Sequence, residues 1–200
     1  MDITSSPNRA FSGLAQALSL PLSNRMLLVV APHAAGSMML ELAARLSLGG
    51  AVRVLDGGNR FNVYPVASAL RRLTGEIYTC LGRITLSRAF TCYQMLTLLE
   101  ETPVIEAPTL LLDFLSTFYD ESVKLEESLR LLDACLPHMR RLAGMAPLLI
   151  SAKPVPPICP DRVVLVNRLR ENVDQSWMME PVPMRAQPSL LDTGKFNHFL

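Results

Sequence analysis

The sequence predicts an α/β fold built on a doubly wound, mostly parallel sheet. Continuous apolar runs, typical of strands that are covered on both faces, alternate with segments whose apolar residues recur at helical spacing. This alternation favours parallel pairing of the strands through crossover helices. Of the 200 residues, 50% are hydrophobic and 18% are charged. That composition indicates an ordered domain with a large core rather than a disordered chain.

Six segments are expected to be strands. The first five are apolar and end in glycine, proline or polar turns, whereas the sixth is expected at an edge of the sheet. They are residues 26–31, 51–55, 84–86, 109–113, 147–151 and 177–179.

Five segments between these strands are expected to be helices, because their apolar residues lie three or four apart. They are residues 38–48, 64–73, 91–101, 123–144 and 161–173. Pro137 lies inside the fourth helix and is expected to kink or interrupt it, since proline lacks the amide hydrogen that a helix interior needs.

The chain is expected to contain one domain with two extensions. Residues 1–25 read as a polar lead with a short helix near 11–18, residues 26–180 as the α/β domain, and residues 181–200 as a proline-containing, flexible tail. In an open parallel sheet the ligand crevice lies at the carboxyl ends of the strands.

Composition argues against several classes of function. The net charge of +1 gives no strong field toward nucleic acid or anionic lipid. The four cysteines form no C-x-x-C pair and have no histidine at metal-ligand spacing, so reduced thiols in a cytoplasmic protein are expected. The N-terminus lacks a signal-peptide pattern, and the most apolar window, 26–48, contains Glu41 and Arg45, which argues against a membrane helix.

The turn after the first predicted strand lies where a phosphate-binding loop would begin a helix. Residues 31–38 read Ala-Pro-His-Ala-Ala-Gly-Ser-Met, whereas a working loop reads G-x-x-x-x-G-K-[ST]. Gly36 is kept, but Ser37 stands at the lysine position and Met38 at the position of the hydroxyl that holds magnesium. Taken alone, this segment is better explained as an ordinary strand-to-helix turn, although a helix N-terminus still favours an anion.

Four further segments occur in a familiar order: Asp56-Gly-Gly-Asn-Arg-Phe61, Ser87-Arg-Ala-Phe-Thr91, Thr109-Leu-Leu-Leu-Asp113 and Leu149-Ile-Ser-Ala-Lys153. Together with the turn, this order resembles the RecA-like recombinase family, especially its archaeal and eukaryotic branch and its paralogues. The resemblance covers about residues 26–153. It implies a RecA-like P-loop ATPase core in which Asp113 ends the Walker B strand.

The departures from this family remove the groups that hydrolyse ATP. The family's activating glutamate falls on Gly58, and its phosphate-binding lysine falls on Ser37. Losing a positioned base or cation costs on the order of 10² or more in rate for each group. The resemblance therefore implies a degenerate ATPase, with no catalytic residue and no metal site assigned.

The candidate nucleotide-binding residues are those at the loop, at the Walker B position and after the fifth strand. They are Ala34, Ala35, Gly36, Ser37, Met38, Asp113 and Lys153. No cofactor is assigned with certainty from the sequence, and ATP is the ligand such a site could hold at low affinity. Asp113 either holds magnesium or, the favoured reading, accepts hydrogen bonds from the empty loop. Lys153 either reaches a phosphate or, the favoured reading, is a solvated lysine.

The leading functional hypothesis is a non-hydrolysing accessory protein in DNA recombination or repair that acts through protein contacts, with a RecA-like or repair protein as partner. DNA contact would be indirect, because the stretch after Lys153 is rich in proline and poor in basic residues. Arg60 and Arg88 are expected in structural ion pairs, Arg88 with Asp56 among the options. The alternatives are a regulatory nucleotide-binding module and an enzyme with altered chemistry that uses Asp56 and Asp113. No membrane association is expected.

Overall fold

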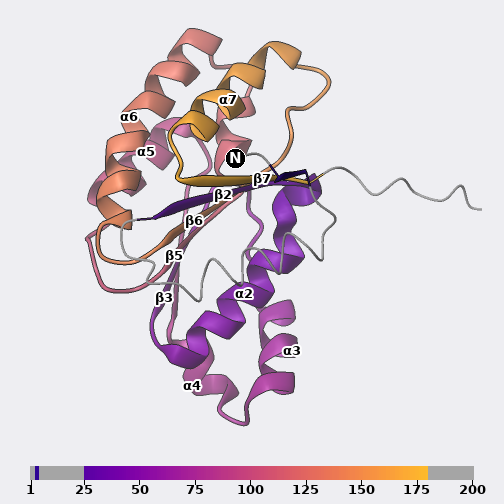
Figure 1. The fold of residues 1–200 in the computed structure, drawn as a ribbon, viewed down its shortest axis with the longest axis vertical. Helices are drawn as coiled ribbons and strands as arrows, with labels where there is room; N and C mark the ends of the chain where they lie inside the picture. The colour runs from indigo at the N-terminus through magenta and orange to yellow at the C-terminus, as the bar shows by residue number, and fades with distance from the viewer. Residues whose placement is uncertain (1–2, 5–24, 180–200) are drawn as a thin grey trace, which may run out of the picture.

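The computed structural model describes residues 3–4 and 25–179, which form a parallel sheet with helices on both faces (Figure 1). The predicted α/β, doubly wound class is confirmed, and the parallel sheet with helices on both faces is consistent with a RecA-like, P-loop type of fold. The helix expected near 11–18 and the tail at 181–200 lie outside the described residues.

The sheet has seven strands, and every adjacent pair is parallel. Their order across the sheet is β1-β7-β2-β6-β5-β3-β4. The strands are β1 (Ile3–Thr4), β2 (Met26–Val30), β3 (Val52–Asp56), β4 (Ile84–Arg88), β5 (Thr109–Leu112), β6 (Leu148–Ala152) and β7 (Gln175–Met178).

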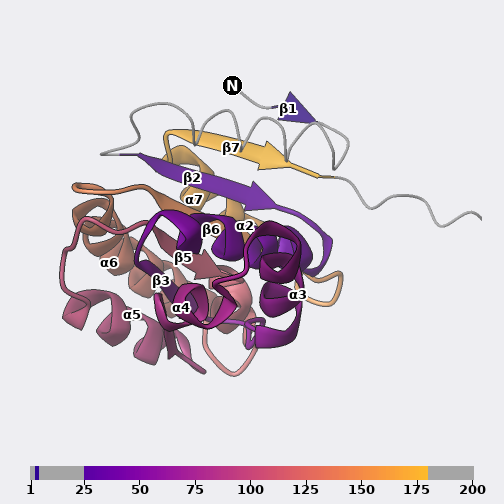
Figure 2. The same cartoon turned by 90° about the horizontal axis from the view of Figure 1, so that it is seen from below.

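Among the residues described, six α-helices cover the sheet, three on each face (Figures 1 and 2). On one face lie α2 (Gly36–Gly49), α3 (Val63–Leu73) and α4 (Ile77–Gly82). On the other lie α5 (Cys92–Glu101), α6 (Leu125–Ala143) and α7 (Val163–Glu171). The alternation of faces follows from strands that are apolar on both sides, because each side needs its own cover.

Side-chain caps fix where two of these helices begin. The side chain of Asn62 accepts a hydrogen bond from the amide of Tyr64 at the start of α3, and Thr91 accepts one from Gln94 at the start of α5. Each cap satisfies an amide that would otherwise lack a partner. Thr91, expected as the first residue of a helix, is therefore its cap.

Three predictions about individual elements need correction, and one helix was not expected. The segment at 177–179 belongs to a strand, but β1 pairs beyond it, so β7 is not the edge. The helix at 125–143 continues through Pro137 without a break. The expected helix at 38–48 begins two residues earlier, at Gly36. The short helix α4 was not anticipated, because its six residues give too few repeats to show a helical period.

The central strands form the buried apolar core, and their ends carry the residues of the candidate site. Leu28, Leu111 and Ile150, on β2, β5 and β6, are fully buried. Because the strands are parallel, the segments that follow β2, β6, β5, β3 and β4 all emerge at one edge, called here the carboxyl edge. No helix among the residues described is both long and apolar enough to cross a bilayer.

Candidate functional site at the carboxyl edge

The turn between β2 and α2 has a strained backbone. His33, Ala34 and Ala35 have φ values of 53°, 54° and 51°, in the left-handed region. That region costs a residue with a side chain about 1–2 kcal/mol. Gly36, by contrast, has an ordinary helical φ of −53°. The glycine that resembles a phosphate-loop residue is therefore not the residue that makes this turn.

The start of α2 presents little charge to a ligand. Ser37 is exposed, while Ala34 and Ala35 are buried and Met38 packs against the core beside α2. The first turn of α2 contains no acidic residue and no side-chain cap. The amide of Gly36 already donates to the carbonyl of His33, and none of residues 34–38 carries a positive charge to hold an anion.

The carboxylate of Asp56, at the end of β3, organises the loop that follows it. Its two oxygens accept backbone hydrogen bonds from Gly58, Arg60 and Phe61, at 3.3, 2.9 and 2.9 Å. The Nε of Arg88, at the end of β4, lies 3.3 Å from the same carboxylate. The side chain of Asp56 is fully buried, so this set of donors is what makes its burial tolerable. The predicted pairing of Arg88 with Asp56 is present in the structure.

Asp113, immediately after β5, is also fully buried, and its partners are cations. Its Oδ2 accepts a hydrogen bond from the Nε of Arg60 at 2.8 Å and lies 3.5 Å from the Nζ of Lys153. Its own amide donates to the hydroxyl of Ser151 at 3.0 Å. Its Oδ1, although buried, accepts no hydrogen bond among the residues described. The favoured expectation, that Asp113 bonds the empty loop, does not describe these partners.

Lys153 follows β6, the strand between β2 and β5, and it faces Asp113. Its Nζ lies 3.2 Å from the hydroxyl of Ser116 as well as 3.5 Å from Asp113. Its side chain is 31% exposed, so it is a paired lysine rather than the freely solvated one that was expected. The hydroxyl of Tyr119 donates to the carbonyl of Lys153, and burial, followed by the charge of Asp113, raises the pKa of that phenol.

Gly58 leaves room for the Asp113 carboxylate. A Cβ at position 58 would lie 2.4 Å from Oδ2 and 2.5 Å from the Cβ of Asp113. No real side chain tolerates such distances. A glutamate at position 58, which the sequence resemblance would call for, is therefore excluded sterically by the Asp113 carboxylate.

These residues form one connected group, called here the carboxyl-edge ion network: Asp56, Arg60, Arg88, Asp113 and Lys153. Arg60 joins its two halves, since its amide bonds Asp56 and its Nε bonds Asp113. With three cations and two carboxylates, the network keeps a surplus of one positive charge.

The network does not suit the magnesium-bound ATP that the fold type suggests. A hard divalent cation prefers several oxygen ligands, but Met38 offers none, and Oδ2 of Asp113 already faces two positive side chains. Within the described part of the chain, no group of three histidine, cysteine, aspartate or glutamate residues is placed to hold a metal ion. The open Oδ1 of Asp113 is a single acceptor and does not make a metal site.

The sequence anticipated part of this arrangement. Gly36, Asp113 and Lys153 lie at the same edge of the sheet, as expected from the parallel order, and the structure joins Asp113 to Lys153. The hydrogen bonds and ion pairs of Asp113 and Lys153 run to residues 60, 116, 119 and 151 rather than to residues 34–38. Reasoning from sequence missed Arg60 as the partner of Asp113.

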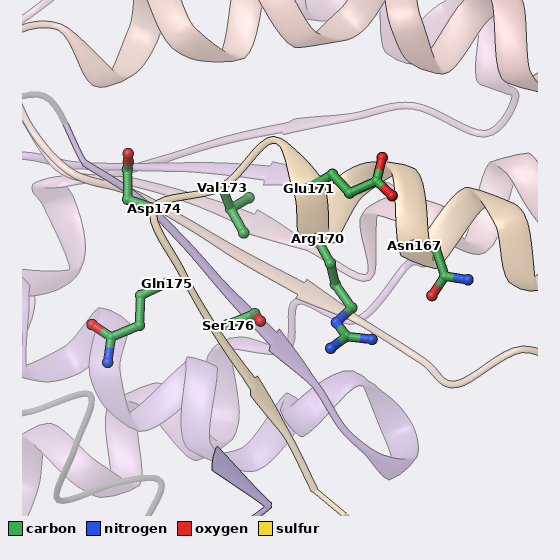
Figure 3. Close-up of a pocket in the computed structure, with 7 residues that line it drawn as sticks. All are labelled: Asn167, Arg170, Glu171, Val173, Asp174, Gln175 and Ser176. Atoms are coloured by element: carbon green, nitrogen blue, oxygen red, sulfur yellow. The ribbon is translucent and has the colours of Figure 1, made fainter. Parts of the chain in front are cut away.

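Two pockets lie away from the turn between β2 and α2. One, of about 370 Å³, lies where α7 leads into β7 and is lined by Arg170, Asp174 and Ser176 among others (Figure 3). It contains none of the candidate residues. A second pocket, at the outer end of the carboxyl edge, includes Arg60 and Arg88.

No protein-family model matches the chain, and no curated protein matches it. The four cysteines are buried and unpaired with one another.

Proposed function

We propose that this chain is a catalytically degenerate RecA-like protein that acts through protein contacts, as a non-hydrolysing accessory factor in DNA recombination or repair. The observation that carries the first half is the pairing of Asp113 with Arg60 and Lys153. In a working site, the Walker B carboxylate would face a metal ion that neutralises developing phosphate charge. Here two side chains of the protein supply the positive charge.

Gly58 supports the same proposal. A base at this position would have to displace the carboxylate of Asp113, because the two would overlap. Without a base to orient water and without a lysine at position 37, positioned charge is lost at two points of the phosphoryl-transfer site. The assignment to recombination and repair rests on the resemblance of the ordered motifs between residues 26 and 153.

The test is phosphate release from ATP and magnesium, with and without single-stranded DNA, by the wild type and by Asp113→Ala. We expect both proteins to release no more phosphate than buffer. Turnover by the wild type that disappears in Asp113→Ala would refute the proposal. The accessory role is tested separately, by adding the protein to a strand-exchange reaction run by the recombinase of the same cell. A changed exchange rate is expected, and an unchanged one would contradict that role.

A regulatory nucleotide site without hydrolysis is the second candidate. It is favoured by the strained turn at residues 33–35, because backbone strain gathers at functional sites, and by the N-terminus of α2 beside it, which has no side-chain cap. Isothermal calorimetry with ATP decides this point. Binding that is weakened by Lys153→Gln would support the candidate, and no heat at millimolar ATP would exclude it.

A further inference from the structure

The outer end of the carboxyl edge contains a pocket of about 620 Å³ between the loop after β3 and the side of β4. Arg60 and Arg88 line it, together with Asn59, Phe61 and Leu86. β4 is the last strand of the sheet, and three strands separate it from β2 in the sheet order. The pocket is thus separate from the turn that resembles a phosphate loop.

The two arginines are held in the same manner. Each uses its Nε to bind a fully buried aspartate: Arg60 binds Asp113 at 2.8 Å, and Arg88 binds Asp56 at 3.3 Å. Their side chains remain 33% and 37% exposed. A guanidinium that is fixed through Nε keeps terminal N–H groups for a second partner, in a planar arrangement that matches an oxyanion.

The terminal nitrogens of Arg60 and Arg88 have N–H groups that are available to a ligand. Of the four, only Nη2 of Arg88 has a partner among the residues described, the carbonyl of Phe61 at 3.2 Å. Because the anchoring carboxylates fix both guanidiniums before a ligand arrives, less side-chain entropy is lost on binding. The pocket is therefore prepared for a phosphate.

The surrounding charge favours an anion as well. Between residues 57 and 99 the sequence has five arginines and one glutamate, a surplus of four positive charges, whereas the whole chain has a net charge of +1. The two aspartates nearest the pocket are fully buried and already paired. Of these five arginines, Arg60 and Arg88 line the pocket, and no acidic residue lines it, so the lining attracts an anion.

Aromatic side chains gather in the same segment. Tyr64 and Phe90 are 79% and 69% exposed, and each lies one or two residues from a residue that lines the pocket. Exposed aromatic rings beside basic side chains suit the stacking of nucleobases next to their phosphates.

We propose that this pocket binds a nucleotide unit, with its phosphate on Arg60 and Arg88 and its base against the neighbouring aromatic side chains. The same chemistry is offered by a free mononucleotide and by a single-stranded nucleic acid. The inference goes beyond the proposed function and does not depend on it, since it involves no ATP turnover and no contact with residues 34–38.

The experiment measures binding of adenosine 5′-monophosphate by calorimetry and of a labelled single-stranded oligothymidine by fluorescence anisotropy. Arg60→Gln is expected to weaken binding about tenfold, the loss of one bidentate charged contact. The matched control is Arg72→Gln, which removes the same charge from the basic segment but lies on α3 outside the pocket, and it should change binding less than about twofold.

Leu86→Glu keeps the proposal testable even if Arg60→Gln destabilises the fold. Leu86 is exposed on β4 and lines the pocket. A carboxylate there should repel the anion while the protein stays folded, as checked by thermal unfolding. Tighter binding of the oligonucleotide than of the mononucleotide assigns the pocket to single-stranded nucleic acid, and equal affinities assign it to the free nucleotide. Absence of binding by both probes, or equal losses in Leu86→Glu and Arg72→Gln, would overturn the proposal.

Discussion

The ends of β2 and of β5 lie at the same edge of one sheet, yet they differ in what they retain. The segment after β2 keeps an unusual backbone, with three left-handed residues before α2, and has no charged side chain that would grip a phosphate. The segment after β5 keeps a buried carboxylate, but with the protein's own cations around it. The segment after β2 thus has a distinctive backbone but no charged side chain. The segment after β5 has a charged side chain, whose partners are cations of the protein itself.

The contrast teaches that the carboxylate at Asp113 has become part of the scaffold. A carboxylate kept for metal binding is usually unsatisfied in the free protein, and its removal often stabilises the fold. A carboxylate that neutralises two buried or half-buried cations does the opposite. Stability measurements on single substitutions at the two strand ends therefore distinguish these roles.

The largest effect is expected for Asp113→Ala. It removes the counter-charge of Arg60 and Lys153 and leaves space in a fully buried site, so the free energy of unfolding should fall by about 3 kcal/mol. Urea denaturation measures it, and Ser37→Ala, at an exposed position after β2, should change it by less than about 0.5 kcal/mol. A more stable Asp113→Ala protein would show that the aspartate is held for a ligand instead.

Gly58→Ala should lower the free energy of unfolding by about 2 kcal/mol, because its Cβ would overlap the Asp113 carboxylate. The same substitution made in the Asp113→Ala background should cost much less, since the overlapping atoms are gone. Equal costs in the two backgrounds would mean that the glycine is needed for another reason.

High pH should weaken the core beneath α5 and α6 independently of the ion network. Burial raises the pKa of the Cys135 thiol to about 12, above its ordinary value of 9.0. Because the folded-state pKa is raised, this thiol's contribution is complete below about pH 9 and is lost as the pH rises toward 12. Between pH 8 and 10 the loss should be about 1 kcal/mol. Cys135→Ala should show a smaller loss over that interval, and an identical loss in both proteins would contradict the assignment.

The smallest effect is expected for Gly36→Ala. Gly36 has a helical φ of −53° and open space where a Cβ would go. The substitution should therefore raise the free energy of unfolding by about 0.5 kcal/mol, through the lower entropy of the unfolded chain. Thermal unfolding measures the change. A clear loss of stability would indicate that the turn after β2 depends on this glycine.

Much of the fold could be predicted from the sequence, because buried parallel strands are continuous apolar runs and their helices show a clear period. The runs that became β2, β5 and β6 were recognised with ends shifted by a residue or so. The two-residue strand β1 could not be found in this way, since its pairing with β7 depends on a distant segment and not on local pattern.

The candidate site was predicted less completely. Parallel topology alone places Asp113 and Lys153 at one edge, and this much was anticipated. The contact between Arg60 and Asp113 depends on the path of the loop after β3, which turns at Asn59 with a φ of 53° and is held by three amides on Asp56. Neither the left-handed residue nor the hydrogen-bonded loop leaves a periodic signal, so the partner of Asp113 had to come from the structure.

The close approach of Gly58 to Asp113 restricts which residues position 58 can hold. A glutamate introduced at position 58 would overlap the side chain of Asp113. Asp113 would therefore have to move or be replaced first, and its partners Arg60 and Lys153 with it. A glutamate at position 58 is therefore compatible with this fold only if several residues of the carboxyl-edge ion network change with it.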